Sequence, residues 1–475
     1  MWKTVQAVVA AGALGMAASA PGAPEPAAGR PLRLEEAIEY ALAHNRELAR
    51  GKLDLEAGEL SVQAAREAAL GFRVVPEGSA GAGPEGGDWR SGIRAGVTAP
   101  FGARVEAGVS ARQIDVEGAP DGRRGEVRLE LSQPLFRNFG SLVRDEPVRA
   151  ADDTWMAARR AWERDRSTLA VRVVELYEDL IQLRHQIDSD EALAARLERL
   201  WALADARERQ GRSTRTEVMR MDLQRGEAAV RLESGRSRLD IRFREFADLL
   251  GLSPEDSFLL HPPELLDLDL ADPERALAVA LAERPDYAQA LQDIATVDRQ
   301  RLLARRALLP DLRLAARRTA YGEGGDWSDA GRLDQEDWFV GLVADMDLNR
   351  RGARLDVRRS DIQAEGARRT AEIVRHRLAL EVHEAMAFYR RTRAELHLAA
   401  RNRELAANRA ELSRALFAAG RASADSVSDA EADFSRAELA ELAARREASV
   451  SAYRLLHVLG TLLPAPRDVL HPPEG

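Results

Sequence analysis

The sequence predicts a mainly α-helical protein built from two similar halves, each of which adds strands to a membrane β-barrel. Three observations predict this fold class. Charged residues make up 31% of the chain and aromatic residues only 5%, a composition typical of long helices and coiled coils. Long stretches of the first half recur in the second. At matching places in both halves, polar and apolar residues alternate with the period of a β-strand.

The duplication is clearest around two glycines. The segment ARERQGRSTRTEVMRMD contains Gly211, and ALFAAGRASADSVSDAE contains Gly420, 209 positions later. Each is followed 40 positions on by a second glycine, Gly251 or Gly460, that ends a helix-like stretch. Nearer the N-terminus, LEEAIEYALAHNRELA recurs as PERALAVALAERPDYA at an offset of 239. A unit this long indicates two equivalent halves rather than a short solenoid repeat.

Residues 1–20 have the features of a secretory signal peptide. Lys3 precedes an apolar run, and Ala18-Ser19-Ala20 suits cleavage, although Pro21 would hinder it. An unstructured alanine-rich tail is the alternative. Residues 21–31 read as a Pro/Ala/Gly linker. No later run of 18 apolar residues occurs, so no transmembrane helix is expected.

The first half, residues 32–251, is expected to begin with a helix over 34–70. Between Phe72 and Phe136 the chain becomes rich in glycine and alternates by two, which predicts strands. A soluble, half-buried sheet is the alternative to a barrel. The barrel is favoured because charged and apolar residues alternate along several strands, as they do between a wet lumen and lipid.

A very long helix then runs from about Pro147 to about Gln210, and at about 1.5 Å per residue it would be roughly 100 Å long. Its apolar positions follow heptad spacing, which calls for nearly parallel neighbouring helices. These positions are Leu169, Val173, Leu176, Leu180, Leu183 and Ile187. Gly211 is the expected tip of a helical hairpin, with Thr214 or Thr216 as the cap of the returning helix.

The second half repeats this plan. A proline-containing linker, residues 252–271, leads into residues 272–463. A helix over 273–309 is followed by strands within 311–348 on either side of a Gly/Asp-rich loop. A second long helix turns at Gly420, and residues 464–475 form a C-terminal tail.

The two halves differ by 30 residues in the strand region. Gly71 to Gly211 is 140 residues, whereas Pro310 to Gly420 is 110. One hairpin of about 10 residues per strand plus loops accounts for the difference. The first half would then hold four strands instead of two: Arg73–Ala80, Ser91–Ala99, Ala103–Ile114 and Gly125–Gln133. Six strands per chain and a wider barrel are therefore expected; a long loop on a four-strand plan is the rival.

The order of these pieces resembles the outer membrane efflux protein family, the TolC-like channels. The resemblance rests on LRLEEAIEYALAHNRELA, the strand exit LSQPLFRNFG, WFVGLVADMDLNRRGAR and the two tip segments. It implies a homotrimer, in which the strands form one β-barrel in the outer-membrane lipid. The helices would form a long coiled-coil α-barrel in the periplasm.

The resemblance also implies a function: passive export, as the exit duct of a tripartite efflux or type I secretion system. The partners would be a periplasmic adaptor and an inner-membrane pump. The adaptor would dock on the hairpin tips, which are Gly211, Arg212, Ser213 and Thr214 in the first half and Gly420, Arg421, Ala422 and Ser423 in the second. Ordinary turns without a partner are the alternative.

In this family the closed entrance is ringed by acidic residues just past the second tip. The matching positions are Asp429, which fits, and Ser426, which replaces the usual acid. Three copies of Asp429 around an axis would make a constriction that attracts cations. An exposed helix aspartate with no such role is the alternative.

Nothing in the sequence supports catalysis, a metal site or a cofactor. His383-Glu384 lacks the second histidine of a zinc-protease motif, and no glycine-rich phosphate loop follows a strand. With no cysteine, thiol chemistry is excluded. Basic and acidic residues are interleaved, so no nucleic-acid surface is expected. A periplasmic coiled-coil scaffold without a pore is the alternative function, but it leaves the strands unexplained.

Overall fold

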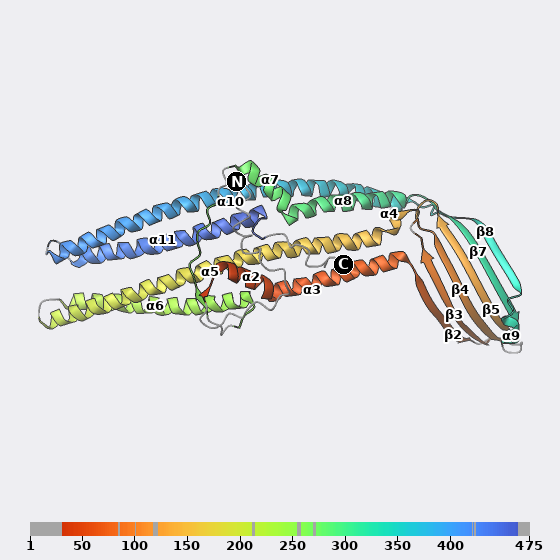
Figure 1. Ribbon diagram of the computed structural model, residues 1–475, viewed down its shortest axis with the longest axis horizontal. Coiled ribbons are helices and arrows are strands. Elements are labelled where there is room, and N and C mark those ends of the chain that lie inside the picture. The colour runs from red at the N-terminus through yellow and green to blue at the C-terminus, as the bar shows by residue number, and fades with distance from the viewer. Residues whose placement is uncertain are drawn as a thin grey trace. The chain divides into compact units, whose positions relative to one another are not determined.

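The structure is a computed structural model that describes residues 31–83, 86–99, 101–116, 122–210, 214–253, 258–268, 272–419, 421 and 424–463. The expected signal peptide and C-terminal tail lie outside these residues. The chain divides into two compact units (Figure 1). The first contains residues 1–52, 161–285 and 375–475, and the second contains residues 53–160 and 286–374.

The second unit contains a six-stranded antiparallel sheet in the order β2-β3-β4-β5-β7-β8 (Figure 1). The six strands expected from the length difference are therefore present and paired. The strands are β2 (Arg73–Gly83), β3 (Gly86–Thr98), β4 (Arg104–Val116), β5 (Gly122–Pro134), β7 (Asp311–Gly324) and β8 (Gln335–Asp345). The first half of the chain supplies four of them and the second half supplies two, and the halves meet where β5 pairs with β7.

The connection between β7 and β8 differs from the expected Gly/Asp-rich loop. Strand β7 continues to Gly324, and a short helix, α9 (Trp327–Ala330), follows. Asp326 starts this helix because its carboxylate accepts hydrogen bonds from the backbone N–H groups of Ser328 and Asp329, both at 2.9 Å. Glycine and aspartate therefore lengthen a strand and cap a helix here.

Helices enter and leave the sheet at one end. Helix α3 (Arg46–Leu70) precedes β2, and α4 (Ser141–Arg144) with α5 (Glu146–Arg209) follows β5. Helix α8 (Pro285–Arg306) precedes β7, and α10 (Arg351–Ala418) follows β8. Within the second unit α5 and α8 are joined by Arg299, which donates to Glu146 at 2.7 Å and also pairs with Asp153. Hydrogen bonds from Arg299, Thr296 and Gln292 lower the pKa of Asp153 against the opposing effect of burial.

The first unit is helical and contains two long hairpins (Figure 1). Helix α5 pairs with α6 (Arg215–Leu250), and α10 pairs with α11 (Ala424–Leu459). The short helices are α2 (Leu34–His44) and α7 (Pro273–Glu283), and β1 (Pro31–Leu32) pairs in parallel with β6 (Leu259–Leu260). The predicted heptad seam of α5 lies in the core, where Val173 and Leu180 are fully buried beside Phe246.

The repeated glycines end equivalent helices. Gly251 after α6 has φ of 78°, and Gly460 after α11 has φ of 75°. This left-handed conformation favours glycine and lets the next N–H reach back into the helix, from Leu252 to Ala247 and from Thr461 to Leu456. A side chain at Gly251 would also lie 2.3 Å from the carbonyl oxygen of His44, at the end of α2.

Two predicted helices are broken. Residues 34–70 form α2 and α3, because Asn45 is extended and its Oδ1 accepts from the N–H groups of Glu47 and Leu48. Its Nδ2 also donates to the Leu249 carbonyl at 2.9 Å. Residues 273–309 form α7 and α8, with an extended Arg284 directly before Pro285. The residue before a proline disfavours helical geometry, which explains the second break.

None of the helices in the described ranges has a stretch apolar and long enough to cross a membrane.

Candidate functional site

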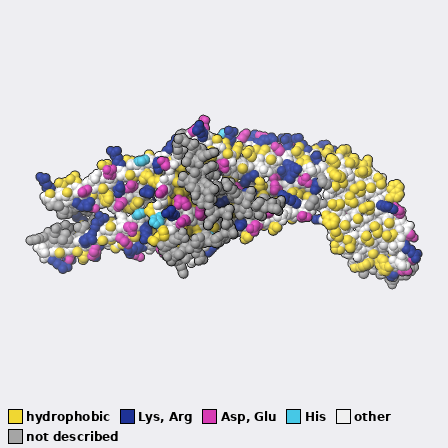
Figure 2. Space-filling model, viewed as in Figure 1, with side chains coloured by type: hydrophobic (Ala, Val, Ile, Leu, Met, Phe, Trp, Pro, Cys, Tyr) yellow, Lys and Arg dark blue, Asp and Glu magenta, His cyan; other side chains and the backbone are white. Residues whose placement is uncertain are grey.

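The sheet has one largely apolar face, interrupted by an ion pair between Arg318 of β7 and Glu336 of β8. Residues with side chains on this face include, strand by strand, Val74, Ile93, Val97, Val105, Val109, Val127, Leu129, Leu131, Leu314, Trp338, Val340 and Leu342. All of these are exposed in the single chain, and Trp338 is 71% exposed. Figure 2 shows hydrophobic side chains gathered over the sheet. An exposed apolar surface of this extent marks a face that contacts another protein or a membrane.

The opposite face is charged and its charges are paired across strands. Arg94 of β3 contacts Glu77 of β2 at 2.6 Å, and Arg112 of β4 makes a two-point contact with Asp88 of β3 at 2.9 and 3.0 Å. Arg124 of β5 donates to Glu323 of β7 at 2.7 Å. An antiparallel sheet with one apolar and one ion-paired face has the two surfaces that a wall between lipid and water needs.

Strands β2 and β8 form the two edges of this sheet, so each pairs on one side only. Unpaired edge N–H and C=O groups are not tolerated in lipid, where water cannot satisfy them. Both edges of the sheet are thus open to pairing with further strands.

Most of the first tip lies outside the described residues, including Gly211, Arg212 and Ser213. Thr214 is exposed and directly precedes α6; its carbonyl accepts from the N–H of Val218 at 3.3 Å. It therefore occupies the cap position proposed from the sequence, whereas Thr216 lies inside the helix.

At the second tip, Gly420, Ala422 and Ser423 lie outside the described residues. Arg421 is exposed, and its N–H donates to the carbonyl of Leu416 at 2.8 Å. Asp429 is exposed on α11, and Ser426 is partly buried one turn before it. Within one chain these two residues lie on the helix that returns from the tip, as expected.

The acidic residues that follow Asp429 form ion pairs with other helices, a feature that the sequence did not predict. Glu431 of α11 accepts from Arg196 of α5 at 2.8 Å and pairs with Arg414 of α10 at 3.1 Å. Asp433 contacts Arg409 of α10. No local pattern reveals these partners, because Arg196 precedes Glu431 by 235 positions.

Contacts between α5 and α11 continue away from the tips. Arg446 contacts Asp179, and Arg454 donates to Glu175 at 2.7 and 2.9 Å. The Ser167 hydroxyl lies 2.7 Å from Nδ1 of His457. The two hairpins of one chain are thus joined by a row of polar contacts along one helix pair.

Within this row Glu178 of α5 is buried, with 5% of its surface exposed. Burial raises its pKa to about 7, against the lowering effect of the Ser449 hydroxyl and of the guanidinium groups of Arg445 and Arg446 on α11. Its Oε1 has no hydrogen-bond partner among the described residues. The side chain therefore changes charge near neutral pH at the joint between the hairpins.

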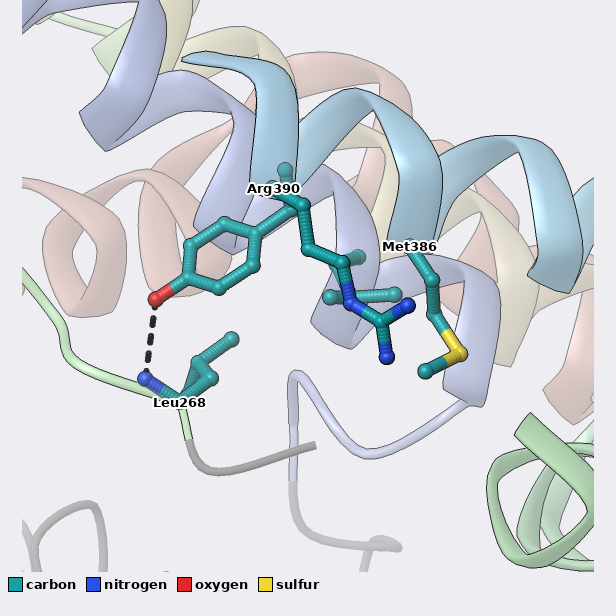
Figure 3. Close-up of a pocket in the computed structure, with 5 residues that line it drawn as sticks. Leu268, Met386 and Arg390 are labelled. Atoms are coloured by element: carbon teal, nitrogen blue, oxygen red, sulfur yellow. Dashed lines mark hydrogen bonds between the residues drawn. The ribbon is translucent and has the colours of Figure 1, made fainter. Parts of the chain in front are cut away.

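Two tyrosines hold the segment that links the halves. The Tyr177 hydroxyl on α5 lies 2.7 Å from the carbonyl oxygens of Leu32 and His261. On α10, the Tyr389 hydroxyl accepts from the N–H of Leu268 at 2.9 Å, as Figure 3 shows. The linker is thus anchored to a long helix from each half.

The pocket beside Tyr389 is small, about 60 Å³. It is lined by Leu268, Met386, Tyr389, Arg390 and Leu455 (Figure 3). A pocket of this size has room for a few water molecules but not for an organic cargo. Among the described residues no group of three or more His, Asp or Glu side chains is placed to hold a metal ion.

Residues 276–461 match the model of the outer membrane efflux protein family. The family resemblance inferred from the sequence is therefore confirmed. The matched segment runs from α7 almost to the end of the second repeat and contains β7, β8 and the second tip. No curated protein sequence matches the chain.

Solved structures of channels share the fold across most of the chain. The outer-membrane channel OprN superposes with a TM-score of 0.69 at 19% identity, with 90% of each chain covered. The CmeC outer membrane channel of Campylobacter jejuni gives 0.70 at 15% identity, covering 92% of this chain and 87% of that one. VceC, an outer membrane protein of Vibrio cholerae, gives 0.68 at 15% identity, with coverage of 90% and 96%.

These likenesses show the fold. The expected class, mainly α-helical with a β portion and duplicated halves, is confirmed, and the family's members are channels rather than enzymes.

Proposed function

We propose that this protein is the outer-membrane channel of a tripartite efflux or type I secretion system. One observation carries the proposal: the six-stranded sheet is apolar on one face and ion-paired on the other, in a chain that matches the outer membrane efflux protein family over residues 276–461. The sheet is part of a barrel in the outer membrane, and the long hairpins extend into the periplasm. Cargo passes through without chemical change.

The active form is a homotrimer. Its support in the single chain is twofold. The edges β2 and β8 need partner strands. On α10, Leu398, Leu405 and Leu412 repeat every seven residues and are about 60% exposed. A heptad stripe of exposed leucines calls for neighbouring helices, which further copies supply. With six strands per copy, the barrel is wider than one with four, since diameter grows with strand number.

The partners are a periplasmic adaptor, which docks on the tips, and an inner-membrane pump, which supplies the energy. Thr214 and Arg421 are exposed beside the two tip turns and mark the docking surface. Gly211, Arg212, Ser213, Gly420, Ala422 and Ser423 complete it. In the trimer, Asp429 lines the entrance and favours cations there, with Ser426 beside it.

The channel itself is tested by purifying the full chain from outer membranes and adding it to planar lipid bilayers. We expect extraction only with detergent, a mass of three chains and stepwise ion conductance. A monomer that washes off in salt and conducts nothing would instead support the scaffold alternative.

The entrance is tested by reversal potentials in a salt gradient. Asp429→Asn should lower the preference for cations. Asp240→Asn, an exposed carboxylate of α6 paired with Arg244 at 3.1 Å, is the control and should not. Equal cation selectivity in the wild type and both variants would show that Asp429 does not line the entrance.

The docking surface is tested by cross-linking, since the chain has no native cysteine. Thr214→Cys and Arg421→Cys, coupled to a short photoactivated linker, should join the adaptor encoded beside the channel gene. Ser61→Cys, exposed on α3, is the control. Cross-linking of the adaptor through Ser61→Cys but through neither tip would place docking elsewhere.

A further inference from the structure

The short helix α9 lies on the apolar face of the sheet, not on its charged face. Gly125 of β5 and Gly322 of β7 are partners in the ladder and belong to that face. A Cβ on Gly125 would lie 2.5 Å from the carbonyl oxygen of Ala330, and one on Gly322 would lie 2.6 Å from the same atom. The two glycines therefore form a notch that admits the backbone of α9. This notch sits where strands from the two halves meet.

α9 also reaches across the end of the sheet farthest from the helix junctions of this unit. At that end Trp89 of β3, Gln113 of β4, Arg123 of β5 and Gly324 of β7 share one level of the ladder on the apolar face. Trp327, the first residue of α9, meets Trp89 edge to face with ring centroids 6.0 Å apart. The segment after β7 thus folds back over the apolar face near its far end.

The exposed chemistry of α9 is mixed. Trp327 is 41% exposed and Trp89 is 45% exposed. The Arg123 guanidinium lies 5.6 Å from the centre of the Trp327 ring and donates to the carbonyl of Gly325 at 3.1 Å. On the other side of the helix, Arg332 pairs with Asp329 at 3.3 Å. The surface of α9 thus combines an apolar ring, a guanidinium group beside it and an ion pair. It is neither purely apolar nor purely hydrated.

We propose that α9, with Trp89 and Arg123, is a lipid anchor that lies in the headgroup–acyl boundary of the outer leaflet. Tryptophan is favoured at that depth because its ring is apolar and its indole N–H is polar. The occupant is lipid because the surface is continuous with the apolar face of the sheet, from Val127 and Ile93 inward. The proposal rests on the proposed function, since it requires the sheet to lie in the membrane.

The anchor has a structural consequence at the β5–β7 pairing. The notch holds α9 against β5 and β7. Lipid contacts of Trp327 and Trp89 therefore act on the strand pair at which the two halves join. Arg123 to Gly325 and Arg124 to Glu323 tie the same two strands. α9 therefore fixes the depth of the barrel at the place where the first half's strands pass to the second half's.

The test is depth-dependent quenching of tryptophan fluorescence. The full-length protein and its Trp327→Phe and Trp338→Phe variants are reconstituted in vesicles of phospholipids brominated near the headgroup or near the chain end. Subtracting each variant isolates one tryptophan. We expect Trp327 to be quenched at least about twofold more by the shallow label than by the deep one, as befits an interfacial ring.

The outcomes separate this inference from the proposed function. If bromolipids quench Trp338 but not Trp327, or quench Trp327 best with the deep label, the anchor is wrong and the membrane barrel stands. If neither tryptophan is quenched, the sheet is not in lipid and the proposed function fails with the anchor.

A matched pair of variants tests the notch. Gly125→Val should displace α9 and remove the shallow-label preference of Trp327. Gly81→Val on β2, where a Cβ would meet nothing within 4 Å, should leave it unchanged. An unchanged preference in trimeric Gly125→Val would show that the notch does not position the anchor.

Discussion

Tyr177 makes hydrogen-bond contacts with both backbone groups of His261. Its hydroxyl accepts from the N–H of His261 at 3.1 Å and lies 2.7 Å from the carbonyl oxygen of the same residue. The ring itself is fully buried against Phe246. Burial also raises the pKa of the Tyr177 hydroxyl to about 12, so it remains a donor at every physiological pH. One side chain of α5 therefore fixes the position of the linker at His261, directly after the two-residue strand β6.

Tyr177→Phe should destabilise the protein by about 1–3 kcal/mol, because the buried carbonyl of Leu32 and the backbone groups of His261 lose their hydrogen-bond partner. The measurement is thermal unfolding of the detergent-solubilised protein. Tyr287→Phe is the control, since no hydrogen bond of its hydroxyl is recorded among the described residues. Equal melting temperatures for the two variants would mean that the linker is held by its apolar contacts alone.

Glu178→Gln should change how stability depends on pH. Because burial raises the Glu178 pKa from 4.5 to about 7, the folded state holds a proton there that the unfolded state releases. The contribution of the Glu178 carboxyl to the free energy of unfolding therefore falls by about 3 kcal/mol as the pH rises from about 4.5 to about 7. The variant should match the wild type near pH 4.5 and exceed it above pH 7, as measured by melting temperature.

Glu175→Gln serves as the control for Glu178. It lies nearly one turn earlier on α5 and pairs with Arg454 at 2.7 Å. Removing a partly exposed, paired carboxylate should lower stability slightly at neutral pH, the opposite sign. A difference between wild type and Glu178→Gln that stays constant with pH would contradict the assignment.

Gly51→Ala should destabilise the protein although alanine favours helices. A Cβ at Gly51 in α3 would lie 2.8 Å from Cδ1 of Trp162, whose Nε1 donates to the Leu48 carbonyl at 3.3 Å. The ring cannot move away without losing that bond. Gly226→Ala in α6 meets nothing within 4 Å and should stabilise by about 0.5–1 kcal/mol. Chemical denaturation measures both, and two variants of equal stability would contradict the tight packing.

Glu431→Gln should weaken the joint between the hairpins near the tips. The carboxylate contacts Arg196 and Arg414 on two other helices, and each partly exposed pair contributes up to about 1 kcal/mol. We expect more frequent or larger openings in single-channel recordings. The control is Glu395→Gln, whose partner Arg391 is on the same helix at 3.6 Å. Recordings of Glu431→Gln that match the wild type would show that these contacts do not restrain the entrance.

The sequence predicts elements well where one residue pattern suffices. Alternation by two located the six strands of the antiparallel sheet, although not the two-residue strands β1 and β6, because side chains of a strand point to opposite faces. The glycines at 251 and 460 marked helix ends correctly, since a positive φ favours that residue. The 30-residue difference between the halves predicted the extra hairpin because chain length limits how many strands can be built.

Features that depend on distant partners were not predicted. The break at Asn45 depends on a carbonyl 204 residues away, whereas the break at Arg284 was signalled by Pro285 and overlooked. α9 was not predicted, because it lies in a Gly/Asp-rich segment whose composition is typical of a loop. Of the candidate tip residues, Thr214 and Arg421 are described beside their turns, and their role stays a prediction.

The shared end at which α3, α4, α8 and α10 join the sheet sets a rule for how such a chain can change in evolution. A half that leaves the sheet at the end where it entered must contain an even number of strands. The four strands of the first half and two of the second obey this rule. A single added strand would deliver the next helix to the opposite end of the sheet. A sheet of this kind can therefore be enlarged only by whole hairpins, so in the proposed channel the pore width would change in discrete steps.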